Sequence, residues 1–93
     1  MTSIVNKYKS SYEVYIGRGS VWGNPFVIGK DGSREEVIEK YKGYFNNKIS
    51  NDVLFLNQTL NLKNKILGCF CKPLACHGDV IVEFLENPEL CVK

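Results

Sequence analysis

Three of the four cysteines, the only histidine and an aspartate lie between positions 69 and 79 of this 93-residue chain. They are Cys69, Cys71, Cys76, His77 and Asp79. Thiolate and imidazole side chains bind metals and act as nucleophiles or bases, and pairs of thiols exchange electrons. The cluster is therefore the first candidate for a functional site.

Metal binding is the first chemistry. Cys69 and Cys71 stand two apart in an apolar run typical of a strand, so their side chains are expected to point the same way, and Cys76 and His77 return from the next loop. Structural zinc sites usually draw on two well-separated ligand pairs, whereas these four residues are close in sequence. We therefore expect no metal and no cofactor, with zinc bound by these four residues as an alternative.

A reactive thiol is the second chemistry. Cys76 or Cys71 would act as a nucleophile if a helix N-terminus stabilised its thiolate and His77 served as base or positive partner. Cys71 and Cys76 would also make a redox pair, although they lack the two-residue spacing of thioredoxin-like motifs. Cys69 is most simply interpreted as a small buried apolar residue in a central strand.

Anion binding is the third chemistry and needs no reaction at sulfur. His77, Gly78 and Asp79 stand where the last helix is expected to begin, and free N–H groups at the positive end of a helix dipole bind anions. Arg18 lies between two glycines. Its guanidinium can hold a phosphate with two hydrogen bonds while the glycines let a ligand approach the backbone.

The loop that contains Arg18 also offers groups that would hold a base or a sugar. Trp22 and Phe26 present flat faces for stacking, and Asn24 can orient a polar edge. The glycine spacing in Gly17-Arg-Gly-Ser-Val-Trp-Gly23 is one residue longer than the dinucleotide fingerprint, so that mechanism is not inferred. Simpler roles stay open: Asp79 as a helix N-cap, Asn24 in a turn and Trp22 in the core.

Two strands are expected to position these loops. Residues 12–16 are rich in aromatic and β-branched side chains and lead into a glycine, and residues 65–71 form a compact apolar run. Between them we expect the glycine-rich loop 17–26, a short strand at 26–28 and a turn at 30–32.

A helix follows the turn. Ser33 and Glu36 form a capping box that predicts a helix from there to about Asn47. One apolar stripe is expected to face the sheet. Its members are Val37, Tyr41, Tyr44 and Phe45.

Two shorter helices complete the pattern. One is expected at residues 51–60, with Val53, Leu56 and Leu60 at helical steps. The last spans residues 79–86 and stops before a proline.

The order of these elements predicts a single α/β domain over residues 1–93. We expect a small sandwich with a short, mostly parallel sheet flanked by about three helices. Ligands of open parallel sheets bind beyond the carboxyl ends of the strands. If strands 12–16 and 65–71 are parallel neighbours, loops 17–26 and 71–79 face each other across one pocket.

The composition limits the classes of partner that we expect for this protein. Twelve basic and ten acidic side chains leave a net charge of +2, which gives no electrostatic footprint for duplex nucleic acid or an anionic membrane. No apolar run approaches the roughly 20 residues that cross a bilayer, and the start lacks the features of a signal peptide, so we expect a cytoplasmic protein. A thin core with several aromatic residues predicts a homodimer.

Two motifs in the chain resemble those of a known family. Tyr15-Ile-Gly-Arg-Gly-Ser with Trp22-Gly-Asn-Pro-Phe26, followed by Gly68-Cys-Phe-Cys-Lys-Pro-Leu-Ala-Cys-His-Gly-Asp79, resembles a family of small domains of unknown function in bacteriophage and bacterial genomes. The family pairs a Trp-Gly-Asn-Pro-Phe segment with a Cys-aromatic-Cys…Cys-His-(Gly/Ala)-Asp segment. The resemblance covers about residues 12–86; it implies one site formed by both loops and a phage or prophage origin, and it implies no activity.

We therefore expect the protein to bind a phosphorylated, nucleotide-like small molecule between the two loops: a nucleotide, a nucleoside or a nicotinamide-derived metabolite. In a phage, such a pocket would capture a host nucleotide signal used in antiviral defence. The expected ligand-binding residues are Gly17, Arg18, Gly19, Ser20, Trp22, Asn24, Cys71, Cys76, His77, Gly78 and Asp79.

Two other classes of function stay open. The first is an enzyme that cleaves or transfers at an N-glycosidic bond of the same ligand class, with Asp79 or Glu13 as carboxylate, His77 as acid or base, and Cys76 as a further catalytic candidate. The second is a zinc-stabilised interaction module that uses the four possible metal ligands.

Overall fold

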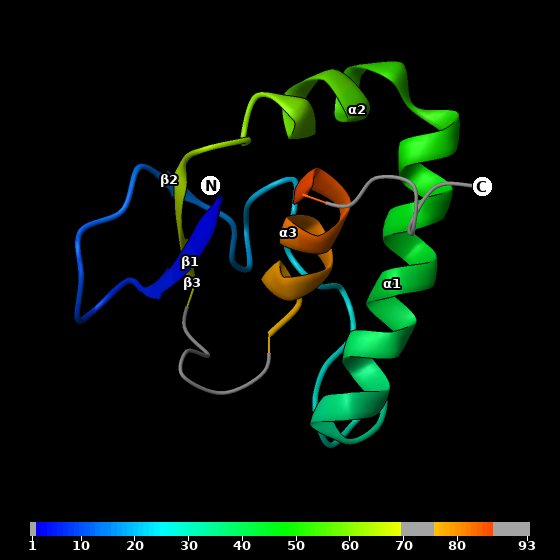
Figure 1. The fold of residues 1–93 in the computed structure, drawn as a ribbon. Helices are drawn as coiled ribbons and strands as arrows, with labels where there is room; N and C mark the ends of the chain where they lie inside the picture. Colours follow the sequence, from blue (N-terminus) through cyan, green and yellow to red (C-terminus); the bar gives the residue numbers. More distant parts are fainter. Residues whose placement is uncertain (1, 70–75, 87–93) are drawn as a thin grey trace.

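The structure, a computed structural model, describes residues 2–69 and 76–86 (Figure 1). Along the chain it forms a small α/β domain with a short parallel sheet, as the sequence predicted. In the described residues the order of elements is β1 (Ser3–Asn6), β2 (Val14–Tyr15), α1 (Arg34–Asn51), α2 (Val53–Leu60), β3 (Ile66–Cys69) and α3 (Gly78–Glu86). None of these helices is long and apolar enough to cross a membrane.

The sheet has the order β1-β3-β2, with β3 in the middle and both neighbours parallel to it. This confirms that the strands before the two loops are parallel neighbours. β2 is shorter than expected, but the N–H groups of Glu13 and Ile16 extend the pairing on either side by donating to the carbonyls of Ile66 and Gly68, at 2.7 and 3.0 Å.

Two details of the strands differ from the prediction, and the end of a third strand lies outside the described residues. β1 comes from a short mixed segment with no clear strand pattern, and its pairing with β3 decides its conformation. Residues 26–28 form no strand, because Ile28 makes only a single bridge to Gly32 across a tight turn. The expected strand 65–71 is described only as far as Cys69.

The capping box at the start of α1 is confirmed. The Glu36 N–H donates to Oγ of Ser33 at 3.2 Å, and the Ser33 N–H donates to the Glu36 carboxylate at 2.8 Å. The helix runs past Asn47 because Ile49 continues the buried stripe. It ends at Asn51, and the side chain of the next residue, Asp52, accepts from the N–H of Phe55 and so begins α2.

The second predicted helix is present as α2, and of the three apolar residues that indicated it only Leu56 packs against the core. Val53 is 72% exposed and Leu60 is 50% exposed, whereas Phe55 and Thr59 are buried. The break at Asp52 sets the rotation of this short helix, and the Phe55 ring packs edge-on against Phe45 of α1 with centroids 5.8 Å apart.

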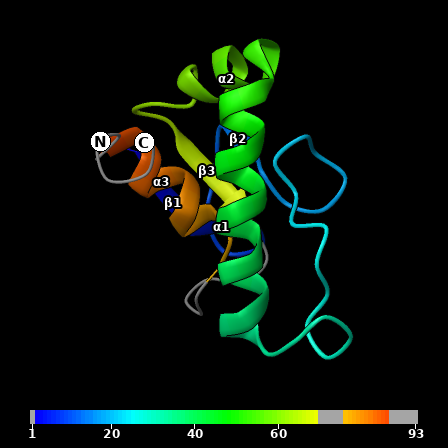
Figure 2. The same ribbon diagram turned by 90° about the vertical axis from the view of Figure 1, so that its right-hand side faces the viewer.

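All three helices lie on the same side of the sheet (Figures 1 and 2). The buried cluster between these layers includes Ile16, Tyr41, Leu67 and Ile81. At the lower end of Figure 1, β1 and β3 reach their carboxyl ends, and α1 and α3 begin. This is the end of the molecule where the sequence predicted a site.

Candidate functional site

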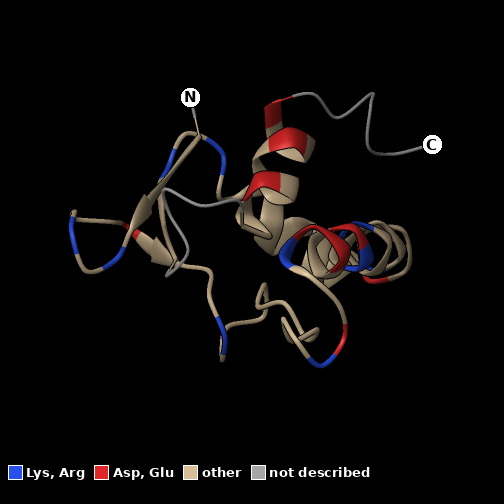
Figure 3. Ribbon diagram, turned by 90° about the horizontal axis from the view of Figure 1, so that it is seen from below, with Lys and Arg blue, Asp and Glu red and all other residues tan. Residues whose placement is uncertain are grey.

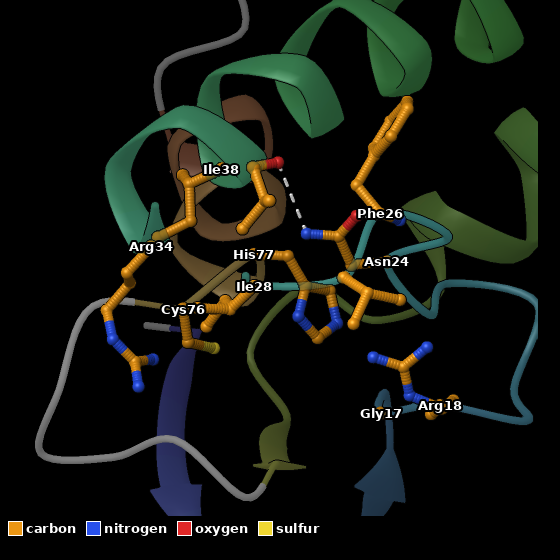
Figure 4. A pocket seen from close by; sticks show the side chains of 11 residues that line it. Gly17, Arg18, Asn24, Phe26, Ile28, Arg34, Ile38, Cys76 and His77 are labelled. Atoms are coloured by element: carbon orange, nitrogen blue, oxygen red, sulfur yellow. Dashed lines mark hydrogen bonds between the residues drawn. The ribbon is translucent and has the colours of Figure 1, made fainter. Parts of the chain in front are cut away.

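A pocket of about 240 Å³ opens at this end of the molecule (Figure 4). Its walls come from the loop after β2, the start of α1 and the two residues before α3. Loop 17–26 and the described part of the second loop therefore contribute to one pocket, as expected. The lining residues are Gly17, Arg18, Asn24, Phe26, Val27, Ile28, Arg34, Val37, Ile38, Cys76 and His77.

Positive charge is the main electrostatic feature of the pocket. Arg18 and Arg34 are the only arginines of the chain, and both line it, whereas no carboxylate does among the described residues. The N-terminal ends of α1 and α3 lie beside it and add the positive ends of two helix dipoles. This arrangement of positive charges favours the binding of an anion in the pocket.

The acidic residues of α3 face elsewhere. Asp79, Glu83 and Glu86 repeat at helical spacing along one side of that helix, where Figure 3 shows them in red. Asp79 and Glu83 line a separate hollow of about 200 Å³ between α1 and α3. They therefore do not neutralise the pocket from within.

His77 occupies the centre of the pocket wall. Its Nε2 lies 2.7 Å from the carbonyl oxygen of Ile16. A carbonyl can only accept, so Nε2 carries the proton and Nδ1 is the acceptor of the neutral ring. The ring also packs edge-on against Tyr41, with centroids 5.1 Å apart.

The pKa of His77 is lowered from its ordinary value of 6.5, chiefly because burial penalises the imidazolium. The hydrogen bond to Ile16 opposes that effect, the positive charge of Arg18 adds to it, and Asp79 again opposes it. The imidazole is therefore neutral at neutral pH and offers a hydrogen-bond acceptor rather than a third positive charge.

Cys76 precedes His77 and is buried. Its Sγ accepts a hydrogen bond from the N–H of Gly78 at 3.2 Å and lies 3.1 Å from Sγ of Cys69. Cys69 is buried at the end of β3, which agrees with its interpretation as a core residue, and it does not line the pocket. In the part of the chain that the structure describes, no three or more His, Cys, Asp or Glu residues are grouped to hold a metal ion.

The opposite wall is apolar and is fixed by a side-chain clamp. Asn24 donates from Nδ2 to the carbonyl of Val37 at 3.3 Å, the dashed line in Figure 4, and its Oδ1 accepts from the N–H of Phe26 at 2.9 Å. Phe26 packs edge-on against Tyr44. Asn24 therefore holds the loop against α1 in addition to lining the pocket.

Several residues predicted for the site do not line the pocket. The indole N–H of Trp22 donates to Oγ1 of Thr59 in α2 at 3.0 Å, so its ring belongs to the packing of the loop on the helices. The Ser20 hydroxyl donates to the Gly17 carbonyl at 2.7 Å and closes a turn. Gly19 has φ +97°, which suits glycine in that turn.

Two predicted site residues of the second loop are also not found in the pocket lining. Asp79 is the second residue of α3 rather than its N-cap, and its carboxylate reaches back to accept a hydrogen bond from the N–H of Cys76 at 3.2 Å. Gly78 contributes its N–H to Cys76 rather than a surface to the pocket. Cys71, a predicted ligand contact and metal ligand, lies outside the described residues.

Sequence reasoning missed the contribution of α1. Arg34 is its first residue, and Val37 and Ile38 follow on the same side. The sequence contained a signal for this contribution. Arg34 precedes Val37 by three positions, so it lies on the same face of the helix as the predicted apolar stripe, at the end that meets the loops. Val27 and Ile28 also line the pocket, whereas the sequence predicted a short strand there.

The family model described as "Domain of unknown function (DUF4326)" matches residues 4–87. The chain is 45% identical over 85 residues to an uncharacterized 12.4 kDa protein in the nrdA-td intergenic region of Enterobacteria phage T4, covering 90% of this chain and 77% of that protein. It is 33% identical over 99 residues to an uncharacterized protein of Acanthamoeba polyphaga mimivirus, covering 87% and 72%. No solved structure matches.

Proposed function

The chain belongs to the DUF4326 family of domains of unknown function, and we propose that it binds a phosphorylated, nucleotide-like small molecule in the pocket described above. One observation carries the proposal. Both arginines of the chain line this pocket, together with apolar side chains and no carboxylate among the described residues.

The arginines favour an oxyanion such as phosphate over a simple halide. A guanidinium donates two parallel hydrogen bonds to a phosphate, which a lysine ammonium cannot do. Arg18 comes from the loop after β2 and Arg34 from the start of α1, and Figure 4 shows the His77 ring between them. A phosphorylated ligand can therefore be held from two sides.

The rest of the pocket suits a compact ring. Phe26, Ile28, Val37 and Ile38 supply apolar contact area. Pockets for drug-sized ligands are about 300–1,000 Å³, and this one is about 240 Å³. The pocket lies below that range, so it can enclose one part of a nucleotide, such as the base or the sugar phosphate, and the rest of a larger ligand would extend into solvent.

His77 adds selectivity. Its Nε2 is engaged by the carbonyl of Ile16, which leaves Nδ1 as the acceptor of the neutral ring. Because His77 lines the pocket, Nδ1 can accept a hydrogen bond from a ligand N–H or O–H. This preference fits a nucleoside or sugar, which carries such donors.

The enzyme alternative has less support from the described residues. Cleavage of an N-glycosidic bond commonly uses a carboxylate, and the two candidates lie outside the pocket. Asp79 accepts a hydrogen bond from the N–H of Cys76, and Glu13 accepts one from the N–H of Ile66 at 2.9 Å. A narrower role, capture of a host nucleotide signal, is supported only by the viral origin of the relatives.

Isothermal titration calorimetry with nucleoside 5′-monophosphates, the matching nucleosides and inorganic phosphate tests the proposal. We expect monophosphates to bind and Arg18→Ala or Arg34→Ala to weaken binding by about 10- to 100-fold, the loss of a charged hydrogen bond or two. Lys63→Ala removes the same charge from an exposed position outside the pocket and is the matched control. Equal affinity of the parent and both arginine variants would overturn the assignment.

Mass spectrometry of the released ligand separates binding from turnover. A binding protein returns the monophosphate intact after denaturation, whereas an enzyme returns a base and a sugar phosphate. Products formed by the parent, and lost in His77→Gln without loss of fold, would favour the enzyme.

A further inference from the structure

The sulfur atoms of Cys69 and Cys76 lie 3.1 Å apart in the core. The first cysteine ends β3 and the second stands two residues before α3, so the contact joins the central strand to the last helix. A disulfide bond is about 2.05 Å long, and closing the gap therefore requires a movement of about 1 Å. The positions of the two sulfur atoms in a disulfide are therefore close to their positions in the fold.

The two thiols differ in access. Both are buried, but Cys76 lines the pocket and Cys69 does not. A small molecule that enters the pocket therefore meets the Cys76 sulfur first. Among the described residues, Cys69 is placed to react with Cys76.

The two thiols also differ in activation. Sγ of Cys76 accepts a hydrogen bond from the N–H of Gly78, at the start of α3. Amide donors and the positive end of a helix stabilise a thiolate, which is the attacking form of cysteine. The geometry favours Cys76 as the nucleophile and Cys69 as the resolving thiol.

We propose that Cys69 and Cys76 form a reversible dithiol–disulfide pair that is oxidised through the pocket by a small-molecule disulfide. The Cys76 sulfur attacks one sulfur of that molecule, its S–S bond breaks, and one reduced thiol leaves with the proton of Cys76. Cys69 then attacks the Cys76 sulfur, the protein disulfide forms, and the second thiol leaves with the proton of Cys69. Two protein thiols are oxidised and one small-molecule disulfide is reduced to two thiols.

The pairing differs from the redox pair considered from the sequence, which joins Cys71 and Cys76. It is also independent of the proposed function, because disulfide exchange at Cys76 requires access to the pocket but no bound nucleotide. Failure of nucleotide binding would therefore leave this inference intact, and its own failure would leave nucleotide binding intact.

Peptide mapping of the folded full-length chain, oxidised with bis(2-hydroxyethyl) disulfide and then alkylated, identifies the bond. Chymotrypsin cleaves after Phe70 and Leu74 and so places Cys69, Cys71 and Cys76 on separate peptides. We expect the linked pair to be Cys69 with Cys76, with a loss of two hydrogen atoms that dithiothreitol reverses. A predominant link through Cys71, or no link in the folded chain, would overturn the proposal.

Single variants test the order of attack. Cys69→Ser should trap one hydroxyethylthio group on Cys76, because the resolving thiol is gone, and Cys71→Ser should still form the internal bond as the matched control. Cys76→Ser should leave Cys69 unmodified while the chain stays folded by circular dichroism. Modification of Cys69 at the same rate in that variant would exclude access through Cys76.

Discussion

The Nε2 atom of His77 lies 2.7 Å from the carbonyl oxygen of Ile16 and ties the residue that follows β2 to the start of α3. The bond joins the two loops whose separate motifs indicated a site. It also fixes the tautomer, so that one side of the imidazole is structural and the other is available to the pocket.

The free energy of unfolding should decrease as the pH falls below 6.5, the ordinary pKa of His77. Burial lowers the pKa of His77 in the folded state below 6.5, so the unfolded chain binds a proton first as the pH falls. The free energy of unfolding therefore decreases from about pH 7.5 to about pH 5.5, by at most about 1.4 kcal/mol per pH unit. Thermal unfolding at these pH values measures it.

The chain has a single histidine, which makes the control simple. His77→Gln removes the titrating group and retains a hydrogen-bond donor. Its unfolding temperature should change less over this pH range. An unchanged pH dependence in that variant would assign the effect to other groups.

Gly23→Ala should destabilise the loop that carries Arg18. A Cβ at this glycine would lie 2.9 Å from the carbonyl oxygen of Gly17 and 3.1 Å from Cα of Arg18, and backbone atoms cannot turn aside. We expect a loss of about 1–3 kcal/mol in urea unfolding, typical of overpacking. Gly43→Ala is the matched control, because a Cβ there meets nothing within 4 Å and should stabilise α1 by about 0.5–1 kcal/mol.

Ser33→Ala should shorten α1 at the end that presents Arg34. It removes the hydroxyl that accepts from the N–H of Glu36, and such a cap contributes about 0.5–2 kcal/mol. Urea unfolding measures the loss, and Ser50→Ala, at an exposed position in the same helix, should change stability by less than about 0.5 kcal/mol. A loss as large in Ser50→Ala would assign the effect to helix α1 in general and not to its cap.

The elements with strong local signals were predictable from the sequence. The capping box at Ser33 located the start of α1 to the residue, and the apolar run before Cys69 identified the central strand. The parallel arrangement then predicted that the two loops share a pocket. These features depend on short-range chemistry and on a general rule for parallel sheets.

The features that depend on tertiary packing were not predictable. β1 is a strand because β3 offers it an edge, and α2 buries Phe55 and Thr59 because the break at Asp52 sets its rotation. Trp22 carries the most prominent side chain of its motif, yet its hydrogen bond to Thr59 is a contact between distant segments that no local pattern reveals.

Tyr41→Phe should loosen the pocket loop without a change in core volume. The buried hydroxyl of Tyr41 donates to the carbonyl of Trp22 at 2.7 Å, and burial raises the pKa of this phenol, so that it stays a donor. Without it the carbonyl loses its partner, and we expect a loss of about 1–2 kcal/mol in urea unfolding. Tyr44→Phe is the matched control, since that hydroxyl accepts only a 3.4 Å hydrogen bond from Lys48 and should be worth less than about 0.5 kcal/mol. Equal losses in the two variants would show that the Tyr41 hydroxyl does not anchor the loop.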